Sequence, residues 1–135
     1  GVKNHYGLTD ALMQPEPMRS FATSISDTNL WLLSGGGAVA NWQSLLASER
    51  GSQRMNELRS EFDHVLIDAP PMNQSTSTML ATAADGVVLV LKANSSRREV
   101  ARKATEDLKA ANVHLLGAVL NQRTFPIPPR IYSKL

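Results

Sequence analysis

The hydrophobic positions of this chain gather into four short apolar runs, separated by stretches in which apolar residues recur at helical spacing. The runs are too short for helices and are rich in β-branched residues, so each predicts a strand. Alternating strands and helices are typical of an α/β fold in which helices cover both faces of a mostly parallel sheet, giving three layers. The predicted strands span residues 30–35, 64–70, 86–93 and 114–121.

The most regular helical pattern follows the third run. Ser96 and Glu99 have the spacing of a capping box, which predicts a helix that starts there and closes near Asn112. Its apolar face is formed by Val100, Ala104 and Leu108. We expect the cations around it to be a solvated helix face and no binding patch; they are Arg97, Arg98, Arg102 and Lys103.

The other helical patterns are shorter or interrupted. Residues 42–62 carry apolar residues at helical spacing, but Gly51 and Ser52 fall among them, so we expect two helices or one kinked helix. Weaker patterns predict short helices over residues 7–13 and 77–84 and a connecting loop over residues 14–29.

The glycine cluster after the first run, residues 34–37, invites a phosphate-loop interpretation. It lacks the spacing GxxxxGK[ST], and no lysine follows it. We therefore expect a loop that needs glycine backbone geometry.

Composition narrows the class of protein. The chain is long enough for one domain over residues 1–135, and its last prolines predict an extended tail over residues 123–135. No apolar run approaches the roughly 18 residues that span a bilayer, and a signal-peptide pattern is absent, so we expect a soluble, cytoplasmic chain. The lack of cysteine excludes disulfides and thiolate chemistry. A net charge of +2 does not indicate nucleic-acid binding.

The clearest candidate for chemistry lies at the end of the second predicted strand. HVLIDAPP, residues 64–71, reads as a strand buried on both faces that stops at Asp68, because Pro70 and Pro71 cannot continue a ladder. Ligands of open α/β sheets bind at the carboxyl ends of strands, where a carboxylate can hold hydrated magnesium or accept a proton. The alternative is that Asp68 only caps the turn by accepting backbone hydrogen bonds.

The order of these elements resembles the C-terminal two-thirds of the cytoplasmic ATPase-like domain of bacterial tyrosine kinases. The stretches that carry the resemblance are GLTDAL (7–12), LLSGG (32–36), Asn41 with LLAS (45–48), FDHVLIDAPP (62–71), ADGVVLVLK (84–92) and GAVLN (117–121). The resemblance implies a deviant-Walker, P-loop NTPase-like fold. It also implies ATP-dependent tyrosine autophosphorylation that regulates capsular and exopolysaccharide synthesis.

The resemblance implies roles for individual residues, with ATP and Mg²⁺ as cofactors. It assigns DAPP (68–71) to the modified Walker motif A-prime, with Asp68 beside the magnesium ion and the attacking hydroxyl, and Pro71 beside the nucleotide. Asn121 falls where the family has a residue beside the adenine, although an asparagine at a strand end can equally satisfy backbone groups. Tyr132 is the candidate phosphorylation site in the tail.

Departures from the family pattern predict that this chain is inactive alone. The Walker A loop and a second acidic motif, Asp-x-Asp, precede residues 7–12 in the family, and neither occurs here. Phosphoryl transfer depends on that lysine-bearing loop, so we expect no bound ATP or Mg²⁺. A family aspartate aligns with Ser77, which can cap a helix but brings no charge to a metal. The missing phosphate-loop strand would lie between residues 64–68 and 87–91, so we expect a rearranged or oligomeric sheet.

For the full-length protein, the resemblance implies a place at the inner face of the plasma membrane. Its partner would be a membrane-spanning polysaccharide co-polymerase or adaptor, with self-association and no nucleic acid. Two other interpretations stay open. The chain is a non-enzymatic, pseudokinase-like interaction module, or it is a fragment of a partitioning or cell-division ATPase of the same fold.

Overall fold

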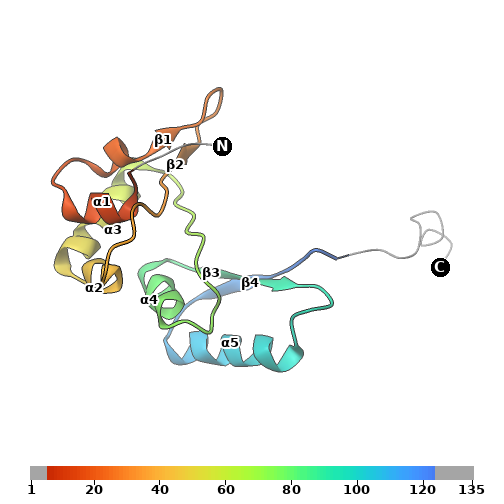
Figure 1. Ribbon diagram of the computed structural model, residues 1–135. Coiled ribbons are helices and arrows are strands. Elements are labelled where there is room, and N and C mark those ends of the chain that lie inside the picture. The colour runs from red at the N-terminus through yellow and green to blue at the C-terminus, as the bar shows by residue number, and fades with distance from the viewer. Residues whose placement is uncertain (1–5, 124–135) are drawn as a thin grey trace. The chain divides into compact units, whose positions relative to one another are not determined.

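The computed structural model describes residues 6–123 (Figure 1). Contacts divide the chain into two compact units, one ending at Asp68 and the other starting at Ala69. The expectation of a single domain over residues 1–135 stays a prediction. The elements are α1 (Leu8–Met13), the 3-10 helix η1 (Met18–Phe21), β1 (Thr23–Ser24), β2 (Trp31–Leu32), α2 (Trp42–Leu46), α3 (Glu49–Glu61), α4 (Ser75–Ala83), β3 (Val87–Lys92), α5 (Arg98–Ala110) and β4 (Leu115–Asn121).

A small core between α1, η1 and α3 holds the first unit together. Ala11 and Met18 are fully buried, and they pack with Phe21 and Leu58. The apolar positions of α3 recur at helical spacing, so the helix turns one stripe toward this core. Within residues 6–123, no helix combines the length and apolar character needed to cross a membrane.

Residues 42–62 form two helices, as expected, but the break lies earlier than Gly51. Ser48 starts α3, and its Oγ accepts a hydrogen bond of 3.2 Å from the N–H of Gly51. Gly51 stands in the first turn of α3, where an added Cβ would overlap the carbonyl oxygen of Leu46. The glycine therefore allows α2 and α3 to approach closely, and it does not end a helix.

The glycine cluster wraps around the start of α1, which confirms that it needs glycine geometry. The N–H of Leu8 donates to the carbonyl of Ser34 at 2.8 Å. Gly36 has a φ of +84°, and a Cβ there would lie 2.7 Å from Oδ2 of Asp10. Because this loop supplies acceptors to the first turn of α1, it is a structural clamp on that helix.

Two of the four predicted strands differ in the structure. Residues 30–35 contribute only β2, which pairs antiparallel with β1, so the predicted loop over residues 14–29 contains η1 and a short strand. Residues 64–70 form no strand, and their expected burial is wrong, since Leu66 is 95% exposed. Among the described residues this segment has no strand partner, and an apolar run without a ladder partner stays an extended loop.

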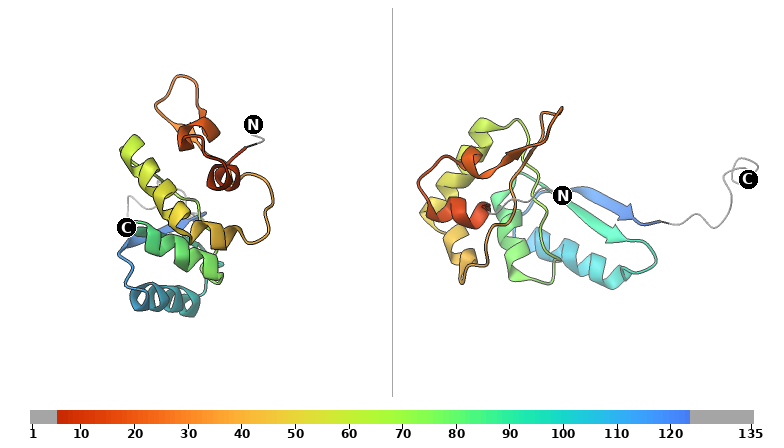
Figure 2. Two further views of the ribbon diagram at one scale, coloured as in Figure 1. Left: turned by 90° about the vertical axis from the view of Figure 1, so that its left-hand side faces the viewer. Right: turned by 45° about the horizontal axis from the view of Figure 1, so that its top comes forward.

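The second unit is built on a parallel pair, β3 and β4, joined by the crossover helix α5 (Figure 2). Val90 lies opposite Val119 in the register, and Leu91 lies opposite Leu120. Parallel neighbours need a crossover of this kind, because a tight turn would reverse the chain direction. The third and fourth predicted strands are confirmed, and the mixture of helix and strand agrees with the α/β class.

The helix α5 confirms the predicted element but corrects its cap and its apolar face. The helix begins after Arg97, and Oγ of Ser96 instead accepts a hydrogen bond of 2.9 Å from the N–H of Lys92. Ala104 and Leu108 are buried as expected, but Val100 is 62% exposed. The helix ends at Ala110, close to Asn112 as expected. The expected solvated cations are exposed; they are Arg97, Arg98, Arg102 and Lys103.

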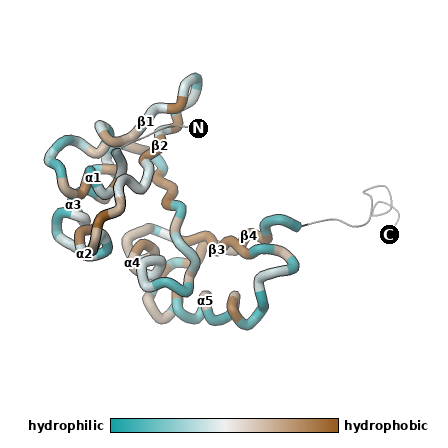
Figure 3. Tube along the Cα trace, viewed as in Figure 1, coloured by the Kyte–Doolittle hydropathy of each residue, from teal (hydrophilic) through white to brown (hydrophobic). Residues whose placement is uncertain are grey.

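One face of the β3–β4 pair is apolar and exposed. Val88, Val90 and Val119 are each about half exposed or more, at 49%, 62% and 51%. The brown stretches in Figure 3 follow the same two strands. Parallel sheets are ordinarily covered on both faces, so an exposed apolar face on a parallel pair is unusual.

Candidate functional site

A serine of α4 binds the Pro70–Pro71 segment that follows Asp68. The helix α4 begins at Ser75, two residues earlier than expected, so Ser77 lies in its first turn and is 2% exposed. The Ser77 hydroxyl shares its single proton between the carbonyls of Pro70, at 2.8 Å, and Pro71, at 2.9 Å. The expected role of Ser77 as a helix cap is wrong, because its hydroxyl is engaged by the two prolines of the preceding turn.

Asp68, the predicted magnesium and proton site, is exposed. Within residues 6–123 its carboxylate has no hydrogen bond or ion pair, so the alternative role as a cap of its own turn is not seen there. The carboxylate is therefore not tied to a structural partner in this part of the chain. Its role toward a metal or a proton stays a prediction.

The predicted site residues are divided between the two units. Asp68 ends the first unit, whereas Pro71 and Asn121 belong to the second. Tyr132 lies outside the described residues. Within those residues no group of three His, Asp or Glu side chains could hold a metal ion. A magnesium site would therefore need donors beyond Asp68.

Asn121 ends β4, where its side chain satisfies the backbone. Its Oδ1 accepts a hydrogen bond of 2.8 Å from the N–H of Gln122, and its carbonyl accepts one of 2.8 Å from Ala93. Of the two roles considered for Asn121, the structure shows the backbone role. Contact with an adenine stays a prediction.

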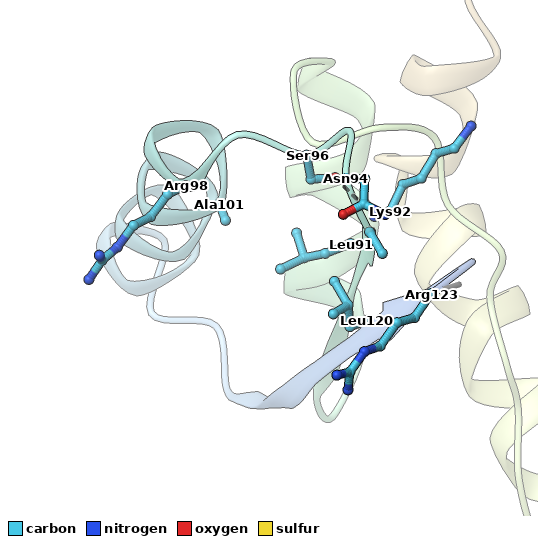
Figure 4. Close-up of a pocket in the computed structure, with 9 residues that line it drawn as sticks. Leu91, Lys92, Asn94, Ser96, Arg98, Ala101, Leu120 and Arg123 are labelled. Atoms are coloured by element: carbon cyan, nitrogen blue, oxygen red, sulfur yellow. Dashed lines mark hydrogen bonds between the residues drawn. The ribbon is translucent and has the colours of Figure 1, made fainter. Parts of the chain in front are cut away.

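A pocket of about 340 Å³ opens at the carboxyl ends of β3 and β4 (Figure 4). Leu91, Leu120 and Ala101 line its apolar interior. The charged ends of Lys92 and Arg98 point away from the hollow. Sequence reasoning missed this pocket, although the rule that ligands bind at carboxyl strand ends pointed to the place.

A second hollow, of about 570 Å³, lies beside α3 in the first unit. Of the two arginines in its wall, Arg50 and Arg54, the second is buried and forms an ion pair of 2.7 Å with Glu57. Partial burial acts to raise the pKa of Glu57. The N–H of Met18 and the Arg54 guanidinium outweigh that effect and hold the pKa below its ordinary value. Since these charges satisfy each other, this hollow is the weaker candidate for a ligand.

The relatives of this chain are bacterial tyrosine kinases, although no family model matches it. It is 31% identical over 121 residues to tyrosine-protein kinase YwqD of Bacillus subtilis, and the match covers 89% of this chain and 51% of YwqD. It is 32% identical over 125 residues to the putative tyrosine-protein kinase CapB of Staphylococcus aureus, and the match covers 90% of this chain and 54% of CapB. The chain therefore spans about half the length of the curated relatives it matches.

The fold agrees with these sequence relationships. The solved kinase domain of VpsO superposes with a TM-score of 0.82 at 29% identity, over 90% of this chain and 60% of that domain. The tyrosine kinase domain of BceF superposes with a TM-score of 0.74 at 27% identity. Sequence and fold thus agree over nearly the whole chain: it is a homologue of the bacterial tyrosine kinases and shares the P-loop NTPase-like α/β fold of their kinase domains.

Proposed function

We propose that this chain forms the C-terminal part of an ATP-dependent tyrosine kinase domain that regulates capsular or exopolysaccharide synthesis. The observation that carries the proposal is the superposition on the VpsO kinase domain over 90% of this chain but only 60% of that domain. The uncovered apolar face of β3 and β4 supports it, because the remaining part of such a domain would bury Val88, Val90 and Val119.

In this function Asp68 takes part in phosphoryl transfer through the magnesium ion or through the proton of the attacking hydroxyl. An exposed carboxylate is suited to holding a hydrated Mg²⁺ or accepting the proton of a tyrosine hydroxyl. ATP with Mg²⁺ would supply the transferred phosphoryl group. Pro71 and Asn121 would lie beside the nucleotide, and Tyr132 would be a phosphorylation site.

The chain lacks the sequence GxxxxGK[ST], whose backbone N–H groups and lysine cradle the phosphates. Asp68 alone cannot replace that cradle, so the phosphate-binding loop has to come from the rest of the kinase domain. In the full-length protein this domain would lie on the cytoplasmic side of the membrane. It would associate there with a membrane-spanning adaptor and with further copies of itself.

A chimera tests the proposal. The segment of the Bacillus subtilis kinase that matches this chain is replaced by the chain, and the purified chimera is incubated with ATP and Mg²⁺. We expect tyrosine phosphorylation, and we expect Asp68→Asn to reduce it at least 100-fold, because the amide keeps the shape but removes the charge.

The parental kinase and a thermal melt of each protein serve as controls. A folded chimera that incorporates no phosphate, beside an active parent, would favour the non-enzymatic interaction module. An Asp68→Asn variant with full activity would leave Asp68 as an ordinary turn residue.

A further inference from the structure

The outer edge of β4 is a strand edge without a partner in the described part of the chain. There the sheet consists of β3 and β4 alone, so the side of β4 turned away from β3 meets no other strand. Its burial pattern loses the usual alternation, since the four consecutive residues 118–121 are all exposed. Val119 is 51% exposed and Leu120 is 55% exposed. Such an edge presents unpaired backbone groups to any strand that can align with it.

The ladder between β3 and β4 shows which backbone groups point outward. The N–H of Ala93 donates to the carbonyl of Asn121 at 2.8 Å, so the backbone of Asn121 faces β3. Successive residues of a strand turn their backbone groups to opposite sides, and the register shift of this ladder lies at its other end. Ala118 and Leu120 therefore turn their N–H and C=O groups away from β3.

Two features of β4 make a second copy of this chain the fitting partner. The strand Leu115–Asn121 contains no charged residue and no proline, which are the residues that keep sheet edges from pairing with another chain. Its middle residue, Ala118, is one of those whose backbone groups point outward. When two copies meet antiparallel around Ala118, the strands overlap along their whole length and no like charges lie opposite each other.

We propose that β4 pairs antiparallel with β4 of a second copy, in an isologous interface whose two-fold axis passes beside Ala118. The two β3–β4 pairs then form one four-stranded sheet. Two strands alone are marginally stable in water, and further strands with an apolar face increase stability. The apolar faces of both copies, formed by Val88, Val90 and Val119, lie on the same side of this sheet, because the two-fold axis is perpendicular to it.

Charges placed at the axis test this register. Ala118 is exposed, so one copy tolerates a charged side chain there, but like charges directly opposite each other destabilise a strand pair. We expect sedimentation equilibrium of the 135-residue chain to show a concentration-dependent dimer, and we expect Ala118→Lys and Ala118→Glu each to weaken it by about tenfold or more. An equimolar mixture of the two variants should restore the dimer, because lysine then faces glutamate. Loss of packing within one copy would not produce this rescue.

The matched control is Val90→Lys, which adds a charge to the same apolar face but on β3, away from the axis. It should leave the dimer unchanged. Because the chain has no cysteine, an introduced one gives a second measurement. The Cα atoms of a hydrogen-bonded antiparallel pair lie about 5.5 Å apart, within the range of a disulfide, so Ala118→Cys should link two copies on mild oxidation. Val90→Cys should not.

A chain that stays monomeric at every concentration measured would overturn the proposal. Equal weakening by Ala118→Lys and Val90→Lys, without rescue on mixing, would show that the apolar faces associate, and it would overturn the proposal as well. The interface concerns the sheet alone and does not rest on kinase activity. A dimer through β4 beside an inactive chimera would keep the interface and refute the proposed function, and a monomer beside an active chimera would do the reverse.

Discussion

Arg54 and Glu57, one turn apart on α3, form an ion pair of 2.7 Å. Each partner also binds the segment that links α1 to η1. Arg54 donates to the carbonyl of Gln14, and Glu57 accepts a hydrogen bond of 2.7 Å from the N–H of Met18. The pair therefore fastens the link between α1 and η1 to the surface of α3. Neither contact is visible in the sequence, because the partners are about forty residues apart.

This network predicts a specific dependence of stability on pH. The pKa of Glu57 is lowered in the folded chain, so folding is favoured by its ionised form. Its contribution to the free energy of unfolding should be fully present above the unfolded-state pKa, about 4.3. It should be lost as the pH falls through the folded-state value. Urea denaturation of wild type and Glu57→Gln, measured between neutral pH and roughly pH 3, should show a shallower acid loss in the variant.

The matched control for this prediction is Glu61→Gln, which changes an exposed glutamate at the end of the same helix. Identical acid slopes for wild type and Glu57→Gln would show that the network does not couple Glu57 to folding.

Gly36→Ala should destabilise the first unit by about 1 to 3 kcal/mol. The substitution places a side chain at positive φ and against the Thr9 hydroxyl and the Asp10 carboxylate. Gly37→Ala is the control, since a Cβ there meets nothing within 4 Å, and it should change stability by less than about 0.5 kcal/mol. Thermal or urea unfolding measures the loss of stability in the two variants. Equal losses would show that Gly36 has no special role.

Leu108→Ala should cost about 2 to 5 kcal/mol, because Leu108 is fully buried on the inner face of α5 and its truncation leaves a cavity. Val100→Ala on the same helix removes methyl groups that are largely in water, so its effect should stay below about 0.5 kcal/mol. Urea midpoints give both values. A large loss for Val100→Ala would mean that the exposed side of α5 is covered in solution.

The 135-residue chain should show no measurable heat of binding with ATP and Mg²⁺ at micromolar concentrations. It has no glycine-rich phosphate loop with its lysine, and the cluster at residues 34–37 is engaged with the start of α1. Isothermal titration calorimetry is the measurement. A micromolar dissociation constant would reveal a phosphate site elsewhere in the chain.

The sequence by itself determined the elements whose information is local. The runs that became β3 and β4, the helix between them and the need for glycine at Gly36 all follow from periodicity and backbone geometry over a few residues. The order of motifs also identified the family.

Only the tertiary structure decided what depends on distant partners. The run Val65–Ile67 has the composition of a buried strand, yet it stays exposed because no strand pairs with it among the described residues. Ser77 and Ser96 both look like helix caps, but each hydroxyl bonds to a neighbouring turn, since the helices begin at other residues. Periodicity indicates which side chains favour burial. The path of the chain in space sets which residues cover those side chains or accept their hydrogen bonds.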